Sequence, residues 1–228
     1  MQALILAGGR GERLKPLTDN TPKSMVRVNG RPFLEYQLAL LKNNGITEIL
    51  LLTGYLGEKI EEYFGDGRKF GFDISYSREE KFLGTAGAIK QAEGKLQGQF
   101  LLLNGDTYLD INYAGLIEFF QWKDKIGVLT VYPNQERIAA NNVRLGPTRL
   151  ILDYSNQKNS LMDCVDAGAA VFKKELTRLI EPSKTVSLQE EIFTKLIAQK
   201  ELASYPAEKR FYDIGTLKGL KLLEEVLG

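Results

Sequence analysis

The most informative feature for chemistry is a glycine-rich segment that carries a cluster of basic side chains. Gly8, Gly9 and Gly11 directly follow a short apolar run, and glycine permits positive φ angles and close approach of the backbone to a ligand. Consecutive backbone amides in such a turn can bind phosphate oxygens. Residues 1–31 contain six basic and two acidic residues, whereas the whole chain has a net charge of only +1. This combination suits a polyphosphate ligand, and a solvated glycine turn is the alternative.

Two common phosphate-binding patterns do not describe this segment. The pattern GxxxxGK[ST] does not occur in the chain, and the dinucleotide pattern GxGxxG fails because the segment Gly9–Leu14 ends in leucine. A dinucleotide-dependent dehydrogenase is therefore disfavoured, and the phosphate loop is of another type.

The chain has no histidine, and this restricts the chemistry that it can perform. The single cysteine, Cys164, has no imidazole to activate it, so Ser-His and Cys-His nucleophilic mechanisms are excluded. Histidine-ligated zinc is excluded as well. The reacting groups must be carboxylates, lysines, arginines, backbone amides or a metal ion held by oxygen ligands.

Composition and charge narrow the class of protein further. The 228 residues are 43% hydrophobic, which is ordinary for a globular protein, and the small net charge gives no reason to expect nucleic acid or an anionic membrane as a partner. One cysteine permits no internal disulfide, and we find neither a signal peptide nor an apolar run long enough to span a membrane. We expect a cytoplasmic protein; the sequence does not fix its oligomeric state.

The elements that must position these groups alternate along the first half of the chain. Short apolar runs predict strands at residues 3–6, 48–55, 73–77, 99–106 and 126–132. Helices are expected between them at residues 31–45, 57–64, 85–96 and 112–123. Such alternation is typical of a mostly parallel sheet that is covered on both faces.

The second half of the chain has a different pattern. Residues 141–155 predict short antiparallel strands with turns, and residues 166–174 predict another apolar strand. Helices are expected at 176–180, 188–200 and 216–228, and a strand ending at 211–216. The whole chain, 1–228, is predicted to be a single α/β domain with a Rossmann-like, mostly parallel sheet and a small antiparallel insertion in its second half.

Polar and glycine residues follow several of the predicted strands. The segments "AGGRG", "TGY", "NGD" and "DIGT" all stand at strand ends. Because open parallel sheets bind ligands at the carboxyl ends of their strands, we expect these segments to gather at one edge and form the site.

Residues 7–25 strongly resemble the signature of the sugar-1-phosphate nucleotidyltransferases, G-G-x-G-x-R-L-x-P-L-T-x-x-x-P-K-x-M. Every fixed position is present, at Gly8, Gly9, Gly11, Arg13, Leu14, Pro16, Leu17, Thr18, Pro22, Lys23 and Met25. The resemblance continues in "FLEYQL", "FLGTAGAI", "LLNGD" and "FYDIGT". The chain looks most similar to short bacterial mannose- and heptose-1-phosphate guanylyltransferases and N-acetylmuramate-1-phosphate uridylyltransferases.

The resemblance implies that a sugar 1-phosphate attacks the α-phosphorus of a nucleoside triphosphate (NTP) and that pyrophosphate leaves. This reaction agrees with the absence of histidine. A phosphate monoester has a second pKa near about 6, so the nucleophile is already ionised at neutral pH and no general base is needed. Catalysis then consists of aligning two anions and offsetting their repulsion.

The resemblance also assigns roles to residues. The nucleotide-binding residues that it implies are Leu6, Ala7, Gly8, Gly9, Gly11, Arg13, Lys23, Glu79, Gly84 and Thr85. Arg13 and Lys23 would also be catalytic, because they neutralise phosphate charge. Asp106 and Asp213 match the two aspartates that hold Mg²⁺; a turn cap and a helix cap before Thr216 are the alternatives.

The sugar side departs from the pattern of larger family members. Many of them carry E-K-P and N-A-G segments, whereas Asp166 takes the asparagine position here and Lys158 is the lysine near the E-K-P region. The predicted sugar-phosphate-binding residues are Asn104, Asp106, Lys158 and Asp166.

The base and the sugar have more than one candidate. The Glu79 carboxylate can accept hydrogen bonds from two adjacent N–H donors of guanine, and it can equally accept from the single N–H of uracil. We expect GTP with D-glycero-D-manno-heptose 1-phosphate or mannose 1-phosphate. The alternatives are UTP with N-acetylmuramate or amino-sugar 1-phosphate and CTP with phosphocholine. A non-catalytic sensor is disfavoured because Lys23, Asp106 and Asp213 are all present.

Overall fold

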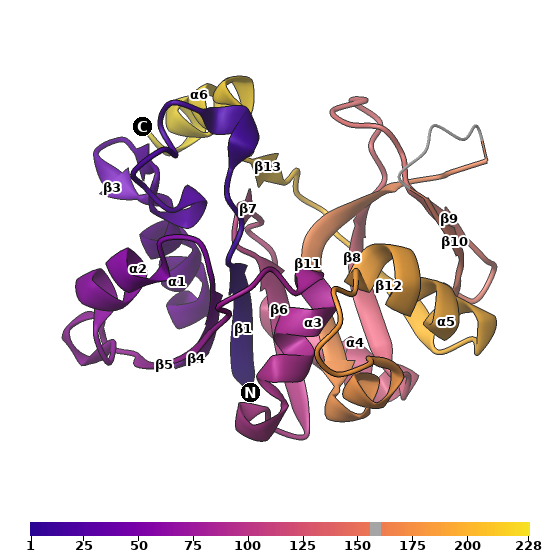
Figure 1. The fold of residues 1–228 in the computed structure, drawn as a ribbon. Coiled ribbons are helices and arrows are strands. Elements are labelled where there is room, and N and C mark those ends of the chain that lie inside the picture. The colour runs from indigo at the N-terminus through magenta and orange to yellow at the C-terminus, as the bar shows by residue number, and fades with distance from the viewer. Residues whose placement is uncertain (156–160) are drawn as a thin grey trace.

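The computed structural model describes residues 1–155 and 161–228. A seven-stranded sheet in the order β12–β8–β11–β6–β1–β4–β5 forms its centre (Figure 1). The strands are β1 (Gln2–Ala7), β4 (Glu48–Thr53), β5 (Asp73–Arg78), β6 (Gln99–Asn104), β8 (Gly127–Tyr132), β11 (Val165–Lys173) and β12 (Leu202–Pro206). Strand β11 runs antiparallel to β6 and β8, and all other neighbours in this sheet are parallel. The predicted mostly parallel α/β fold is therefore confirmed.

Smaller elements surround this sheet. The α-helices are α1 (Phe33–Asn43), α2 (Gly57–Phe64), α3 (Gly84–Gln91), α4 (Tyr113–Lys123), α5 (Phe193–Ala198) and α6 (Leu217–Leu227). Short 3₁₀ turns lie at Glu12–Leu14, Lys23–Met25, Arg68–Phe70, Glu93–Lys95 and Lys174–Leu179, and a π-helical turn lies at Leu188–Ile192. Three two-stranded sheets pair β2 (Arg27–Val28) with β3 (Arg31–Pro32), β7 (Thr107–Tyr108) with β13 (Tyr212–Asp213), and β9 (Val143–Leu145) with β10 (Ile151–Tyr154). The β9–β10 pair is the predicted antiparallel insertion.

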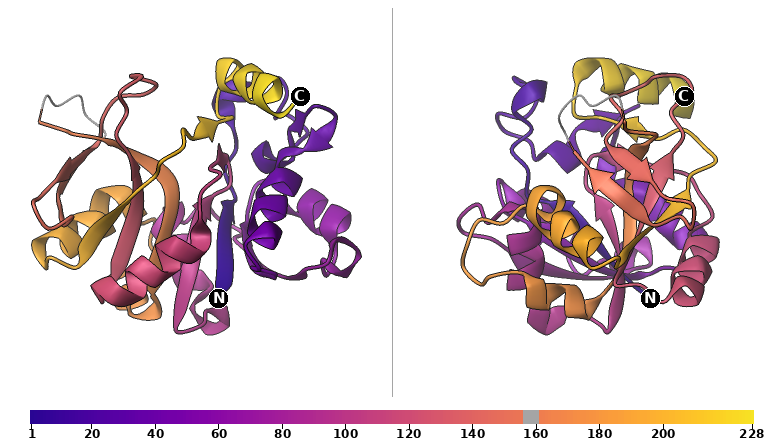
Figure 2. Two further views of the ribbon diagram at one scale, coloured as in Figure 1. Left: turned by 180° about the vertical axis from the view of Figure 1, so that it is seen from behind. Right: turned by 90° about the vertical axis from the view of Figure 1, so that its right-hand side faces the viewer.

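Helices cover both faces of the sheet because successive side chains of each strand point to opposite sides. Ala3 and Ile5 of β1 share a core with α1, α2 and α4, whereas Leu4 belongs to a second core with α3 and α5. Figure 1 shows α3 and α5 in front of the sheet, and the view from behind in Figure 2 shows α1 and α4 on the other face.

A third, smaller core joins the N-terminal glycine segment to helix α6. Leu14, Val26 and Phe33 pack with Ile214 and Leu223, all of them buried. Figure 1 shows α6, in yellow, beside the indigo N-terminal segment. The basic residues of this segment are thereby fixed against an element about 200 residues away in the sequence.

Three details differ from the sequence-based expectation. The predicted strand at 211–216 is only the two-residue β13, and it pairs with β7 outside the central sheet. Strand β12, which the sequence pattern did not indicate, forms the sheet edge beside β8. The helix expected at 176–180 is a 3₁₀ segment, Lys174–Leu179. No helix among the described residues has the length and apolar character to cross a membrane.

Candidate active site

A cleft of about 320 Å³ opens at the carboxyl ends of β1 and β6. The predicted site residues that line it are Leu6, Ala7, Gly8, Gly9, Gly11, Lys23, Glu79, Gly84, Thr85, Asn104 and Asp106. These residues come from four separate parts of the sequence. Of the four segments expected at this edge of the sheet, residues of "AGGRG" and "NGD" line the cleft, whereas "TGY" and "DIGT" do not, and Asp213 of "DIGT" belongs to β13, outside the central sheet. Arg13, Asp166 and Asp213 lie outside this lining, and Lys158 falls outside the described residues.

The glycine segment needs glycine at Gly11 for two reasons. Its φ angle is +65°, which lies in the left-handed region, and a Cβ atom there would lie 2.8 Å from the Thr18 methyl carbon. The Thr18 hydroxyl donates a 2.9 Å hydrogen bond to the Gly11 carbonyl oxygen. The buried Thr18 of the signature thus fixes the turn that lines the cleft.

Lys23 and Asp106 form an ion pair at the end of the cleft. Their side chains are 14% and 29% exposed, so the pair is largely shielded from water. Asp106 follows Gly105, and a Cβ atom at Gly105 would collide with the Leu6 carbonyl oxygen. The glycine therefore lets the turn after β6 lie directly against β1, and this brings Asp106 to Lys23.

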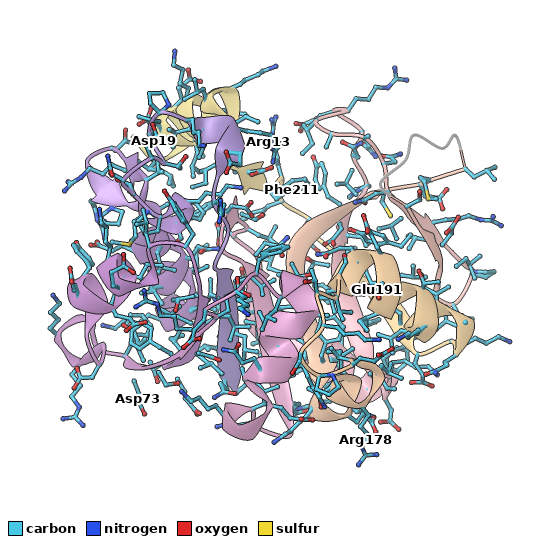
Figure 3. The ribbon with its side chains drawn as sticks, viewed as in Figure 1. Arg13, Asp19, Asp73, Arg178, Glu191 and Phe211 are labelled. Atoms are coloured by element: carbon cyan, nitrogen blue, oxygen red, sulfur yellow. The ribbon has the colours of Figure 1, made fainter. Side chains whose placement is uncertain are left out.

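Arg13 and Asp213 converge on the same place through Gly215. A Cβ atom on Gly215 would lie 2.7 Å from Asp213 Oδ1, 2.8 Å from Lys23 Nζ and 2.9 Å from an Arg13 guanidinium nitrogen. Only a residue without a side chain leaves room for these three charged groups. Arg13 itself is exposed, where α6 and β13 meet (Figure 3).

Asp213 reaches the site by pairing with the segment that follows Asp106. The antiparallel pair of β13 and β7 places Asp213 opposite Thr107, and the Ile214 amide donates a 2.9 Å hydrogen bond to the Asp106 carbonyl oxygen. Burial raises the pKa of Asp213, and the nearby negative charge of Asp106 raises it further. The Gly215 amide opposes this rise by donating a 2.6 Å hydrogen bond to Oδ1.

The donor set fits a divalent cation that is shared with phosphates. Two carboxylates that repel each other would both be stabilised by such a cation. Within residues 1–155 and 161–228, no group of three or more His, Cys, Asp or Glu side chains is placed to hold a metal. Mg²⁺ is commonly held by one or two carboxylates, with substrate phosphates and water completing its shell, so the two aspartates suffice.

Glu79 stands on the opposite side of the cleft, after β5. Its Oε2 accepts a 3.0 Å hydrogen bond from the Leu83 amide, and burial raises the pKa of its carboxyl group. Oε1 lies close to the backbone of two glycines. A Cβ atom added to Gly8 would lie 3.0 Å from Oε1, and one added to Gly54 would lie 2.8 Å from it. The carboxylate therefore retains one oxygen beside the glycine segment.

Gly84 and Thr85 line the cleft and also stabilise the local structure. Gly84 has a φ of +73°, and a Cβ atom there would lie 2.5 Å from the Val186 carbonyl oxygen. The Thr85 hydroxyl accepts a 2.8 Å hydrogen bond from the Leu188 amide and donates one of 3.0 Å to Gln189 Oε1. Both residues thus hold α3 against the segment before α5.

Gln189 lines the cleft and was not predicted from the sequence. Its nearest sequence feature is Ser187, a helix N-cap whose hydroxyl accepts a hydrogen bond from the Glu190 amide; such a cap indicates where a helix starts and says nothing about function. The exposed side chain of Phe82 at the mouth of the cleft was also missed.

Asp166 lies in a smaller adjoining space. It shares that space with Asn104 and Gln189, which also line the main cleft, so the two spaces are neighbours. Asp166 Oδ2 accepts a 3.2 Å hydrogen bond from the Tyr154 hydroxyl, and Oδ1 accepts one of 2.9 Å from the Gly168 amide. Burial raises the pKa of this carboxyl group.

Known proteins resemble this chain in sequence over nearly all of its length. A family model described as "Nucleotidyl transferase" matches residues 2–225. An N-acetylmuramate alpha-1-phosphate uridylyltransferase from Neisseria meningitidis is 33% identical over 100% of this chain and 99% of its own length. A D-glycero-alpha-D-manno-heptose 1-phosphate guanylyltransferase from Aneurinibacillus thermoaerophilus is 31% identical over 94% of this chain and 93% of its own.

Solved structures share the fold. The crystal structure of HddC from Yersinia pseudotuberculosis complexed with GMP-PN has a TM-score of 0.84 at 22% identity and covers 100% of this chain and 99% of its own. At an identity this low, the similarity shows only that the fold is shared.

Proposed function

The chain belongs to the nucleotidyl transferase family and is a sugar-1-phosphate nucleotidyltransferase, and we propose that it joins GTP to a heptose or mannose 1-phosphate and releases pyrophosphate. One phosphate oxygen of the sugar 1-phosphate forms a bond to the α-phosphorus of GTP. The bond from the α-phosphorus to the bridging oxygen of the β-phosphate breaks, and pyrophosphate leaves with its electron pair. The product is a GDP-linked sugar.

The phosphate chain of the nucleotide lies along the glycine segment in this proposal. The support is the approach of bare backbone at Gly8, Gly9 and Gly11 to the cleft beside Lys23. Lys23 then faces the α-phosphate, where negative charge gathers as the new bond forms, and Arg13 neutralises the outgoing phosphates. A preorganised cation in a shielded site stabilises this charge without reorganising during the reaction.

Asp106 and Asp213 hold Mg²⁺ in this proposal. When bound, the ion supplies charge neutralisation to the reacting phosphates. The chain has no need of a general base, because the sugar phosphate is already ionised. Lys23 keeps Asp106 paired in the meantime, so the carboxylate is not left as an isolated charge.

The observation that carries the base assignment is the Glu79 carboxylate on the wall of the cleft. Guanine presents N1–H and N2–H₂ as adjacent donors, and a carboxylate can accept from both; because Oε2 already accepts from the Leu83 amide, the acceptors that remain are Oε1 and the second lone pair of Oε2. Adenine has no such pair of donors, and a carboxylate left unpaired in the cleft carries a larger desolvation penalty than a neutral group does. We therefore expect ATP to be the poorest substrate.

A second candidate is a uridylyltransferase, because the relative from Neisseria meningitidis matches the full chain. Uracil offers one N–H donor to Glu79, and the sugar would then be N-acetylmuramate 1-phosphate. In either case Asn104 and Asp166 are proposed to contact the sugar phosphate, from the space next to the main cleft.

The test measures pyrophosphate release for four NTPs against a panel that includes heptose, mannose and N-acetylmuramate 1-phosphates. We expect kcat/KM to be highest with GTP, lower with UTP or dTTP, and lowest with ATP. Glu79→Gln should narrow the preference for GTP and leave the Mg²⁺ dependence unchanged; Glu80→Gln, at the exposed neighbouring position, is the control. A tenfold advantage of UTP over GTP across the panel would overturn the guanine assignment.

A further inference from the structure

A single buried side chain on α1 spans the turn that carries Asp106. Gln37 is 1% exposed, and its Nε2 donates 2.8 Å hydrogen bonds to the carbonyl oxygens of both Asn104 and Thr107. These two carbonyls flank Gly105 and Asp106 in the sequence. One amide group therefore holds both ends of the turn at the carboxyl end of β6.

The oxygen of the same amide group differs from its nitrogen. Gln37 Oε1 is buried and has no hydrogen-bond partner within residues 1–155 and 161–228. A buried carbonyl oxygen without a partner lowers stability by about 1–3 kcal/mol. Packing alone therefore does not account for a glutamine at this position. The two hydrogen bonds that its Nε2 donates to the turn do.

The turn is fixed from two other sides by backbone contacts. The Gly105 amide donates a 3.1 Å hydrogen bond to the Leu6 carbonyl oxygen, and the Ile214 amide donates one of 2.9 Å to the Asp106 carbonyl oxygen. The first contact ties the turn to β1 and the second ties it to the segment that carries Asp213. The Gln37 side chain holds the turn from a third direction, that of α1. This is the contact that a side-chain substitution can remove.

We propose that Gln37 is a positioning residue for the site: its amide fixes the Asn104–Thr107 turn so that the Asp106 carboxylate stands beside Asp213 and Lys23, ready to share a divalent cation. The inference rests on the proposed function in assigning that cation to Asp106. It adds a residue that touches neither substrate nor metal and acts only through two backbone carbonyls.

Gln2 offers a matched control at the other end of the same sheet. It is 3% exposed, and its Nε2 donates hydrogen bonds of 3.1 Å to the Lys95 carbonyl oxygen and 3.3 Å to Glu48 Oε1. Gln2→Leu removes a buried amide at the start of β1, where its oxygen also accepts a 3.2 Å hydrogen bond from the Gln97 amide, whereas the site lies beyond the end of β1. Any effect of general destabilisation should therefore appear in both variants.

The experiment measures Mn²⁺ binding by electron paramagnetic resonance, together with the unfolding temperature and the Mg²⁺ dependence of pyrophosphate release. Loss of a residue that orients a metal ligand typically weakens metal binding about 10–100-fold. We expect Gln37→Leu to weaken Mn²⁺ binding at least tenfold and to raise the Mg²⁺ concentration for half-maximal rate by a similar factor. Gln2→Leu should bind Mn²⁺ like the wild type.

Gln37→Asn keeps an amide but is one methylene too short to span both carbonyls, so it gives the same test if Gln37→Leu does not fold. Wild-type Mn²⁺ binding in the Gln37 variants, or an equal loss in Gln2→Leu, would overturn the inference. Mn²⁺ binding that depends on Gln37, in a protein that releases no pyrophosphate with any substrate pair, would instead reject the proposed function and leave the role of Gln37 standing.

Discussion

At the scale of single residues, two carboxylates distant in the sequence meet at one point. Burial and then the negative charge of Asp106 raise the pKa of Asp213, and the Gly215 amide, Lys23 and Arg13 oppose that rise. If the pair holds a divalent cation, removing either charge should weaken its hold on the reacting phosphates.

We predict that Asp106→Asn and Asp213→Asn each lower turnover at least about 100-fold, because the charge of a bound metal stabilises the transition state by several kcal/mol. Steady-state rates at saturating Mg²⁺ give the measurement, and circular dichroism verifies the fold. Asp110→Asn is the control, since Asp110 lies four residues further along the chain, after β7, and pairs with Lys209. Near-normal turnover in either site variant rejects that aspartate as a ligand.

Asp166 gives a prediction about pH. Burial raises the pKa of this carboxyl group, so above the usual range of aspartate the native state binds more protons than the unfolded state does. The free energy of unfolding therefore falls as pH rises through that window. Asp166→Asn should remove this decline, because its amide carries no charge: the amide oxygen can still accept from Gly168, and the amide nitrogen can donate to the Tyr154 hydroxyl oxygen where the carboxylate accepted from it.

Urea unfolding at about pH 5 and about pH 8 measures this effect, within the range where native proteins are commonly most stable. Asp163→Asn, at an exposed position nearby, controls for the substitution itself. An Asp166→Asn variant whose stability declines with pH as steeply as that of the wild type would show that the buried carboxylate is not the cause.

The residues of the site differ in how far the sequence could predict them. The placement of Gly8, Lys23 and Asp106 in one cleft follows from strand ends and the signature. The roles of Gln37 and Gln189 do not, because each depends on contacts with residues far along the chain. The helical spacing of its apolar neighbours does put Gln37 on the buried face of α1, but no local pattern shows which backbone carbonyls its amide would bind.

At the scale of elements, helix α6 is the support of the basic segment. Leu223 is fully buried in the core that α6 shares with Leu14 and Val26. We predict that Leu223→Ala lowers the free energy of unfolding by about 2–5 kcal/mol, and that it lowers kcat/KM at least tenfold where the protein is still folded.

Leu116→Ala is the matched control, because Leu116 is equally buried but belongs to α4 and to the core that α4 shares with α1 and α2. Denaturant unfolding and steady-state kinetics below both transitions separate the two effects. If the two variants lose activity to the same extent, the third core has no special relation to the site.

Elements were predicted best where one physical signal dominated. Strands β1, β4 and β6 are uninterrupted apolar runs buried on both faces, and the sequence predicts them closely. Strand β12 has the sequence LASYP, whose serine and proline weaken that signal. The two residues of β13 become a strand only because they meet β7, and no local pattern records such a partner.

At the scale of the whole molecule, the cleft should couple ligand binding to stability. A ligand present at 100 times its Kd stabilises the folded state by about 2.7 kcal/mol, which for a chain of this size raises Tm by roughly 5–10 °C. We predict such a rise for GTP with Mg²⁺ at that concentration and a smaller rise for ATP at the same concentration. Differential scanning fluorimetry measures both, and an equal shift for the two nucleotides would contradict selection by the base.

The packing of α6 against the N-terminal segment also affects the order in which the protein can fold during synthesis. Besides the shared apolar core, the Asn29 amide donates a 2.8 Å hydrogen bond to the Glu224 carbonyl oxygen. Ribosomes add about 5–20 residues per second, so α6 is synthesised roughly ten seconds or more after residues 8–28. A nascent chain can close β1, β4 and β6 long before that time, yet if residues 8–28 bind the nucleotide as proposed, we expect it to bind one only after α6 has been made.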